Sequence, residues 1–319
     1  MTRPPRAAVP SLSATLTTAL DLGAVALSAL HGARPVDRLD RFHTLLAIYE
    51  LHAAPLTVLG PRVRWQHHPA VAEIKTRLEA EWLAELDARR LPQLPADAVS
   101  AMRALAARDR LPAAYRWLAK EADWDQLVQF LALEGGPDAG FDDLVALGQV
   151  GLTGSAKMEL GTNYWDEMGN GDPDAVHTAL HDRLVAAIDM PRIPVDDQPV
   201  EALERMALGG LVSTNRWLQP ELLGALGLIE LQAGPRCRLV LQAFDRLGAP
   251  AAAYPFYEVH AEVDPRHGKD WLEKAVGPTV AARPDWGPRV IRGAWWRSSV
   301  NAAFFTMVAE LVGSGRAAA

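Results

Sequence analysis

Hydrophobic residues recur every three or four positions along most of the chain, which is the spacing of one face of an α-helix. Between residues 70 and 90 this spacing is kept by Val71, Ile74, Leu78, Trp82 and Leu86. Comparable patterns predict helices over 97–108, 111–135, 200–217 and 289–315, and a helix-rich run continues from 217 to 243. Alanine and leucine, both strong helix formers, dominate these segments.

Alternating patterns typical of strands are scarce; the nearest is CRLVLQAF at 237–244, and its neighbours favour a helix. Loops are indicated where proline and glycine gather, at 91–97, 135–143, 191–200, around Gly234 and near 282. We therefore predict an all-α protein, a helical bundle with short connections. A boundary in the proline-containing segment 91–98 divides a predicted N-terminal helical extension, residues 1–98, from a main bundle, residues 99–319.

The length of 319 residues suits one large domain or two modest ones. The net charge of -7 comes without any basic run, which argues against a nucleic-acid partner. A single cysteine, Cys237, excludes an intramolecular disulfide and a thiolate metal cage, so a reducing cytoplasm is the expected location.

The N-terminus resembles an export signal only weakly. Arg3 and Arg6 precede an Ala/Leu-rich run, but serines, threonines and Asp21 interrupt it. A membrane-spanning helix needs about 20 predominantly apolar residues, and no window qualifies. We expect a short disordered lead, then an amphipathic helix, and no membrane partner.

The segment HAEVDPRH, residues 260–267, carries candidate chemistry. Residues advance about 100° along an α-helix, so His260, Asp264 and His267 share one face and could bind one metal ion or two adjacent ions. Their apolar or amphipathic neighbours Phe256 and Tyr257 direct this face inward, where such groups need partners. The alternative is a solvated face with chance histidines. Pro265 predicts a kink or partial unwinding here.

A second cluster lies in NYWDEMGNGDPDAVHTALH, where Asp166 and Glu167 close a helix. Asp172 is the expected N-cap of the next helix, with Pro173 in its first turn. Glu167 and His177 are ten positions apart, about 280° on one straight helix, but the GNGDP turn can redirect the chain so that they converge. The alternative is that the two acids only cap or solvate a helix end.

Glu134 is a third candidate, because it follows the apolar residues Phe130, Leu131 and Leu133. A carboxylate in such surroundings is costly unless a metal or another partner neutralises it. The competing interpretation is a glutamate that simply ends a helix before Gly135.

Three predicted helices thus bring carboxylates and imidazoles without any thiolate. Such ligands from a helical bundle are typical of a non-haem di-iron or di-manganese centre, whereas zinc is disfavoured, since structural zinc prefers Cys and His.

The order of an upstream Glu, NYWDEMGNG-x5-H and FYEVH-x3-D-x2-H resembles the iron-containing redox enzymes of the haem-oxygenase-like di-metal oxidase superfamily. The resemblance covers roughly residues 100–315. Carried over by position, it implies six metal ligands: Glu134, Glu167, His177, His260, Asp264 and His267. The segment GGPDAGFDD after Glu134 leaves Glu121 or Glu159 as substitutes for that ligand, and His181 is assigned a supporting or structural role.

The resemblance implies a core of seven helices, two iron ions cycling between Fe(II) and Fe(III), and O2 as co-substrate. It implies oxidation of a small amino-acid-like or amine substrate by N-oxygenation, desaturation or C–C cleavage, as in natural-product biosynthesis. Alternatives are a fatty-acid oxidative decarboxylase, a thiaminase-like non-oxidative enzyme and a non-catalytic metal-binding protein. No dinucleotide-binding motif is present, so electrons come from an external donor or from the substrate; a homodimer is left open.

Candidate substrate-binding residues are Arg297 and Tyr257. Arg292 and Arg297 lie beside Trp295 and Trp296, a combination suited to holding a carboxylate against an aromatic wall. The alternative is an amphipathic helix with exposed arginines. From this we favour a small carboxylate-bearing substrate over a long-chain fatty acid.

Overall fold

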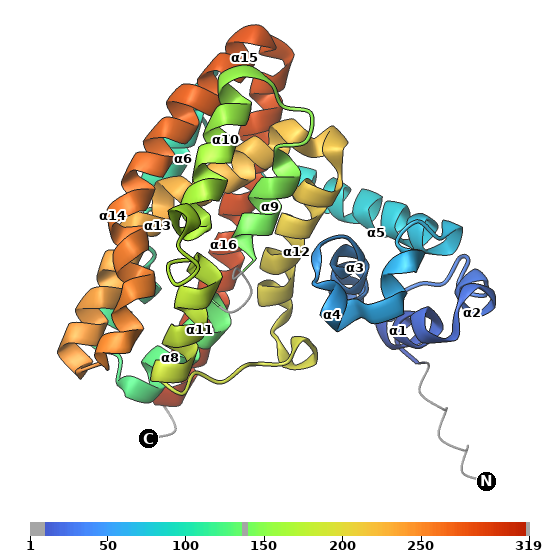
Figure 1. The fold of residues 1–319 in the computed structure, drawn as a ribbon, viewed down its shortest axis with the longest axis horizontal. Helices are drawn as coiled ribbons and strands as arrows, with labels where there is room; N and C mark the ends of the chain where they lie inside the picture. Colours follow the sequence, from blue (N-terminus) through green and yellow to red (C-terminus); the bar gives the residue numbers. More distant parts are fainter. Residues whose placement is uncertain (1–9, 136–139, 317–319) are drawn as a thin grey trace. The chain divides into compact units, whose positions relative to one another are not determined.

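The computed structural model describes residues 10–135 and 140–316 of the chain (Figure 1). Every regular element in these residues is a helix, which confirms the all-α prediction. The strand-like segment 237–244 is the last part of a long helix, as its neighbours indicated. The predicted N-terminal lead falls mainly on residues 1–9, and the predicted loop after Gly135 partly on 136–139, both outside the described residues.

The chain divides into two compact units, Met1–Ala88 and Arg89–Ala319. The predicted boundary at residues 98 and 99 lies slightly later, where the first long helix of the second unit begins, and it stays a prediction. Among the described helices, none has the length and apolarity needed to cross a membrane.

The first unit is built from helices of 4 to 20 residues. Its elements are α1 (Leu12–Leu22), α2 (Ala24–Ser28), α3 (Arg38–Ala53), α4 (Leu56–Leu59), the 3-10 helix η1 (Gly60–Trp65) and α5 (Pro69–Ala88). The apolar positions that predicted α5 are all buried. Among them Trp82 packs edge-on against Phe42 of α3, with ring centroids 5.0 Å apart, so this face of α5 forms the core of the unit.

The second unit contains the remaining helices, including the two longest. They are α6 (Ala98–Arg108), α7 (Ala113–Lys120), α8 (Trp124–Glu134), α9 (Phe141–Gly148), α10 (Gly154–Glu167), α11 (His177–Ala187), α12 (Val200–Thr214), α13 (Gln219–Leu247), α14 (Tyr254–Asp270), α15 (Gly277–Ala282) and α16 (Gly287–Arg316). Short 3-10 turns are η3 (Gly169–Gly171), η4 (Val195–Asp197), η5 (Arg216–Leu218), η6 (Ala251–Ala253) and η8 (Pro284–Trp286), and η7 (Trp271–Val276) is π-helical.

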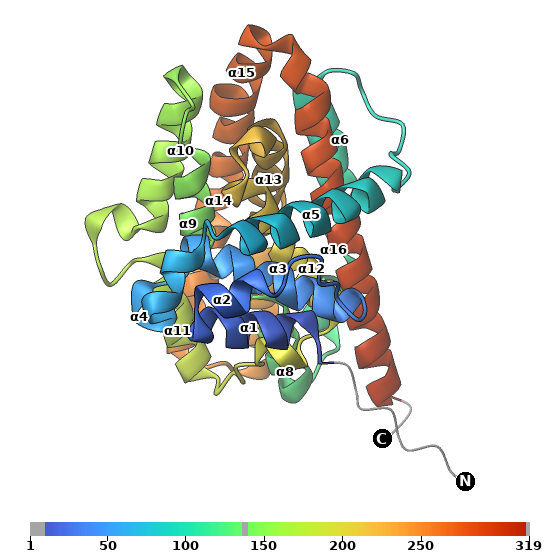
Figure 2. The ribbon, with the colours of Figure 1, turned by 90° about the vertical axis from the view of Figure 1, so that its right-hand side faces the viewer.

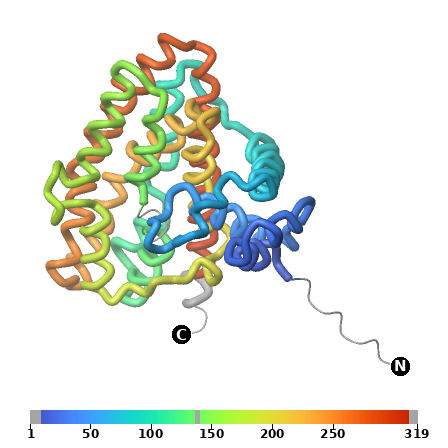
Figure 3. The backbone as a smooth tube through the Cα atoms, turned by 45° about the vertical axis from the view of Figure 1, so that its right-hand side comes forward, coloured from blue at the N-terminus to red at the C-terminus, as the bar shows by residue number. Residues whose placement is uncertain are grey.

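Helix α13 is the centre of this unit, because it packs most extensively against α14 on one side and α16 on the other (Figure 2). It forms an antiparallel hairpin with α14, whose backbone path can be followed in Figure 3. Helix α14 continues through Pro265, so the predicted partial unwinding at this residue is wrong, and the alternative, a kink, stays a prediction. Its π-helical continuation begins only at Trp271.

Candidate metal centre

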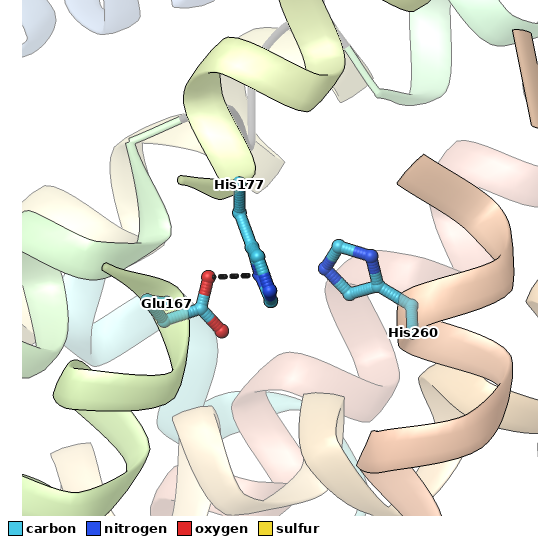
Figure 4. A group of neighbouring side chains, drawn as sticks. All are labelled: Glu167, His177 and His260. Atoms are coloured by element: carbon cyan, nitrogen blue, oxygen red, sulfur yellow. Dashed lines mark ion pairs between the residues drawn. The ribbon is translucent and has the colours of Figure 1, made fainter. Parts of the chain in front are cut away.

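Three of the predicted ligand residues meet in a first group, Glu167, His177 and His260 (Figure 4). Their ligand atoms all lie within 4.8 Å of one another. Glu167 Oε2 lies 2.6 Å from His177 Nδ1, and the rings of His177 and His260 have centroids 4.5 Å apart. The group therefore gathers one carboxylate and two imidazoles from α10, α11 and α14.

The turn between α10 and α11 brings Glu167 and His177 together. Glu167 ends α10 and His177 begins α11. Between them, Gly169 has a φ of +63°, and a Cβ built there would lie 2.6 Å from the carbonyl carbon of Ala175, so this position requires glycine. The predicted start of α11 at Asp172 is wrong: the Asp172 side chain instead accepts from the amide of Asp174, in a turn that precedes the helix.

A second group consists of Glu230, Asp264 and His267, and their ligand atoms also lie within 4.8 Å of one another. All three residues are buried. His267 Nδ1 lies 3.7 Å from Glu230 Oε2 and 3.9 Å from Asp264 Oδ1. Glu230, in the middle of α13, was not predicted from the sequence. The predicted common face of residues 260–267 is divided between the groups: His260 belongs to the first, and Asp264 and His267 belong to the second.

Close packing of α13 on α14 places Glu230 opposite Asp264 and His267. A Cβ built on Gly268 would lie 3.0 Å from the Glu230 carbonyl oxygen, and one on Gly234 would lie 2.9 Å from Pro265 Cδ. The two helices can approach this closely because the contact positions lack side chains. Larger residues would push the carboxylate of Glu230 away from its partners.

Neighbouring polar groups orient three of the candidate ligands. His260 Nδ1 contacts the Phe256 carbonyl oxygen at 2.6 Å; a carbonyl only accepts, so Nδ1 carries the proton and Nε2 keeps its lone pair. His267 Nε2 contacts Asp166 Oδ2 at 2.7 Å, leaving Nδ1 toward Glu230. The Asn163 amide donates to Glu230 Oε1 at 2.9 Å. Such partners are the usual support of metal-binding side chains.

The electrostatics of the two groups reflect burial and the crowding of like charges. Burial and the neighbouring His177 lower the pKa of His260 to about 4. Burial and the carboxylates of Glu230 and Glu167 raise the pKa of Asp264 well above its usual range. Burial alone would lower the pKa of His267, but Glu230 and Asp166 raise it to about 9. The carboxylates thus create a demand for positive charge.

The two groups fit iron in their chemistry. They supply three carboxylates and three imidazoles, the oxygen and nitrogen donors that iron accepts. Asp264 Oδ2 and His267 Nδ1 are buried and have no hydrogen-bond partner among the described residues. Buried polar atoms of this kind normally have a partner, and a cation between them would provide it.

One cavity of about 130 Å³ touches both groups. Its lining includes residues of the two candidate metal-binding groups and a second set of polar residues that belong to neither group. The first are Glu167, His177, Glu230, His260 and Asp264, and the second are Tyr115, Glu134, Arg205, Arg236 and Asn301. Asp142 of α9 also lines it, and its pKa is raised by burial, by Asp143 and by Glu167.

Glu134 lines this cavity but lies outside both groups. The Tyr115 hydroxyl donates to its Oε1 at 2.7 Å, and Arg205 Nη2 lies 3.2 Å from the same atom. Its carboxylate thus has the protein partner that its apolar flanks required. Glu121 and Glu159 were the predicted alternatives to Glu134 as a metal ligand. Glu121 is exposed, and Glu159 is buried, with Lys274 Nζ 3.7 Å from its carboxylate.

His181, for which a supporting or structural role was predicted, is buried and packs edge-on against Phe256, with ring centroids 5.2 Å apart. It lines a neighbouring pocket with Met190 and Met206 rather than the cavity at the centre.

The two predicted substrate-binding residues differ in position. Tyr257 lines the cavity, whereas Arg297 is 1% exposed and donates from Nη1 to the Arg205 carbonyl oxygen at 3.3 Å. Arg292 does hold a carboxylate beside an aromatic ring, since it lies over Trp296, but the carboxylate is that of Glu221 at 2.6 Å. These arginines stabilise the packing of α16 on α12 and α13.

The comparison with known families matches residues 128–302 to the iron-containing redox enzymes. This match spans more than half of the 319 residues, so the chain belongs to that family, with its haem-oxygenase-like helical fold. Family membership makes it an iron-dependent oxidoreductase, and both candidate groups lie within the matched residues. The comparison with curated proteins finds no match.

Proposed function

We propose that the protein is a non-haem di-iron oxidase or oxygenase that uses O2 to oxidise a small amino-acid-like or amine substrate. The observation that carries this proposal is the pair of three-residue groups on one cavity, both drawing ligands from the same face of α14. Asp264 belongs to the second group and lines the cavity together with Glu167, His177 and His260 of the first. Two adjacent sites of this composition suit a pair of iron ions.

Glu167, His177 and His260 would hold one ion, and Glu230, Asp264 and His267 the other. Iron bound there would supply the redox chemistry and the site at which O2 is reduced.

The surrounding residues keep these ligands in place. Asp166 and the Phe256 carbonyl fix the orientation of one imidazole in each group, and Asn163 holds one oxygen of Glu230. The enclosing helices exclude bulk water from the buried carboxylates.

The charged residues of the cavity lining support a small amino-acid-like substrate. Arg205, Arg236 and Glu134 line the cavity beside the candidate ligands. Such groups bind the carboxylate and ammonium groups of an amino acid, which favours this substrate over the fatty-acid alternative. N-oxygenation, desaturation and C–C cleavage are the proposed reaction types, with an external donor where the substrate supplies too few electrons.

The test is reaction of the anaerobically Fe(II)-loaded protein with O2, followed by stopped-flow absorbance and oxygen uptake. We expect rapid oxidation of the centre and its acceleration by the correct member of an amine and amino-acid panel. Glu230→Gln should slow oxygen uptake more than about tenfold, because even supporting residues of metal sites matter that much. The matched control is Glu258→Gln, an exposed position of α14.

Oxygen uptake equal in both variants would contradict the assignment. Less than one iron per chain after loading would favour a thiaminase-like enzyme, and bound iron without oxygen uptake would favour a metal-binding protein without turnover.

A further inference from the structure

The end of the cavity away from the candidate ligands carries two buried guanidinium groups, Arg205 and Arg236. Glu134 is the carboxylate beside them, and it pairs with Arg205 at 3.2 Å. Arg205 therefore has a carboxylate partner in the cavity wall.

Arg236 has no carboxylate within ion-pair distance among the described residues. It is 7% exposed, and its hydrogen bonds go to uncharged acceptors: the Asp109 carbonyl at 2.7 Å, the Gln232 side chain at 2.8 Å and the Arg110 carbonyl at 3.4 Å. These bonds use Nε and Nη2, and Nη1 makes none to the described residues. A buried charge without a counter-charge is costly unless a partner arrives.

The surroundings hold this guanidinium in a fixed position. The Tyr115 and Phe305 rings lie 5.7 and 5.3 Å from it, and the Arg236 pKa is lowered chiefly by burial. Tyr115 is in turn hydrogen-bonded to Glu134. A preorganised, poorly hydrated guanidinium is well suited to bind a carboxylate.

The spacing along α13 relates this end to the candidate metal centre. Glu230, Ala233 and Arg236 all line the cavity, and six residues of helix correspond to about 9 Å along the axis. A small molecule bound by a carboxylate at Arg236 would therefore extend its other end toward the candidate ligands.

We infer that Arg236, flanked by Arg205, binds the carboxylate of a small monocarboxylate substrate and directs the rest of that molecule toward the candidate metal centre. The direction of the molecule depends on the proposed function, but binding of the carboxylate does not. Arg236 is the recognition residue, and Glu134 holds Arg205 in place. The class of substrate is therefore a small carboxylate-bearing molecule such as an amino acid.

The experiment compares butyrate with butyramide, which has a similar shape and no charge, by ligand-observed NMR titration of the full-length chain without added metal. Leaving out metal removes coordination of the carboxylate by iron, so failure here is distinguishable from failure of the di-iron proposal. We expect butyrate to bind at least about tenfold more tightly. Equal binding of the two probes would overturn the inference.

Arg236→Gln should abolish the preference for butyrate and leave butyramide binding unchanged. The matched control is Arg238→Gln, two residues further along α13, whose exposed side chain donates to the Ala261 carbonyl. A butyrate preference that survives in Arg236→Gln would overturn the inference. If that variant does not fold, Arg236→Lys retains a charge and should keep a reduced preference, and the comparison of probes on the unaltered chain still decides.

Discussion

Asp166→Asn should weaken one of the two proposed iron sites selectively. Asp166 Oδ2 lies 2.7 Å from His267 Nε2, and its side chain is 11% exposed. The substitution keeps the size of the side chain but removes the negative charge that holds the imidazole and makes it more basic. His267 belongs to the group with Glu230 and Asp264, so this group should be affected.

The expected loss of iron affinity follows from the weakened hydrogen bond between Asp166 and His267. Loss of a supporting partner of a metal-bound histidine costs about 10–100-fold in affinity, or roughly 1.4–2.7 kcal/mol. Asp166 also accepts from the largely exposed Arg266 at 2.9 Å, so part of its charge is already compensated. We therefore expect a change near tenfold.

The assay is an anaerobic Fe(II) titration against a competing chelator. The unaltered chain should bind two equivalents, and in Asp166→Asn one of them should weaken while the other stays unchanged. Asp182→Asn is the matched control, because Asp182 and its partner Arg192 are both highly exposed. Equal weakening of both equivalents, or of neither, would refute this reasoning.

Three further outcomes are expected. Gly169→Ala should cost about 1–3 kcal/mol in unfolding free energy and lower the iron content, because of its positive φ and the contact with Ala175; unchanged denaturant unfolding would contradict this. Glu134→Gln should retain two irons per chain by metal analysis, since Arg205 and Tyr115 already hold this carboxylate; loss of one iron would make it a ligand. Asp40 accepts three backbone amides, which lower its pKa against the effect of burial. Its stabilisation is therefore present above pH about 4 and lost as the pH falls through the folded-state pKa. The melting temperature of Asp40→Asn should accordingly lie below that of the unaltered chain at pH 7 and approach it in acid, and a constant difference would refute the assignment.

The helical class was predictable because one face of each helix must be buried. The apolar positions of α5 keep the helical interval, and all of them are buried. Likewise, the common face of His260, Asp264 and His267 follows from helical geometry alone. The division of this face between two groups depends on α10, α11 and α13, and local spacing contains no information about these contacts.

Glu230 shows where prediction from the sequence stops. It lies among buried leucines, as Glu134 lies among apolar residues, so a buried carboxylate is equally costly at both positions, although only Glu134 was predicted. What separates them is the partner: Arg205 approaches Glu134, whereas Asp264 and His267 approach Glu230. Both partners come from distant parts of the chain, so only the tertiary packing distinguishes the two acids.

Arg297 and Arg236 show in the same way that only the tertiary packing decides which side chain lines the cavity. Arg297 next to a pair of tryptophans suggested substrate binding, but it is buried against the Arg205 carbonyl. Arg236 belongs to the segment around Gly234 where a loop was predicted, but this segment lies inside α13, and Arg236 reaches the cavity. Arg297 lies on the side of α16 that contacts α12, whereas Arg236 lies on the side of α13 that lines the cavity. Periodicity cannot assign these sides once both sides of a helix are buried.

The most direct measurement is anomalous X-ray scattering at the iron edge from crystals of the anaerobically Fe(II)-loaded protein. We predict two iron peaks, one bound by Glu167, His177 and His260 and the other by Glu230, Asp264 and His267. A single peak, or iron bound away from the second group, would contradict a di-iron centre in this protein.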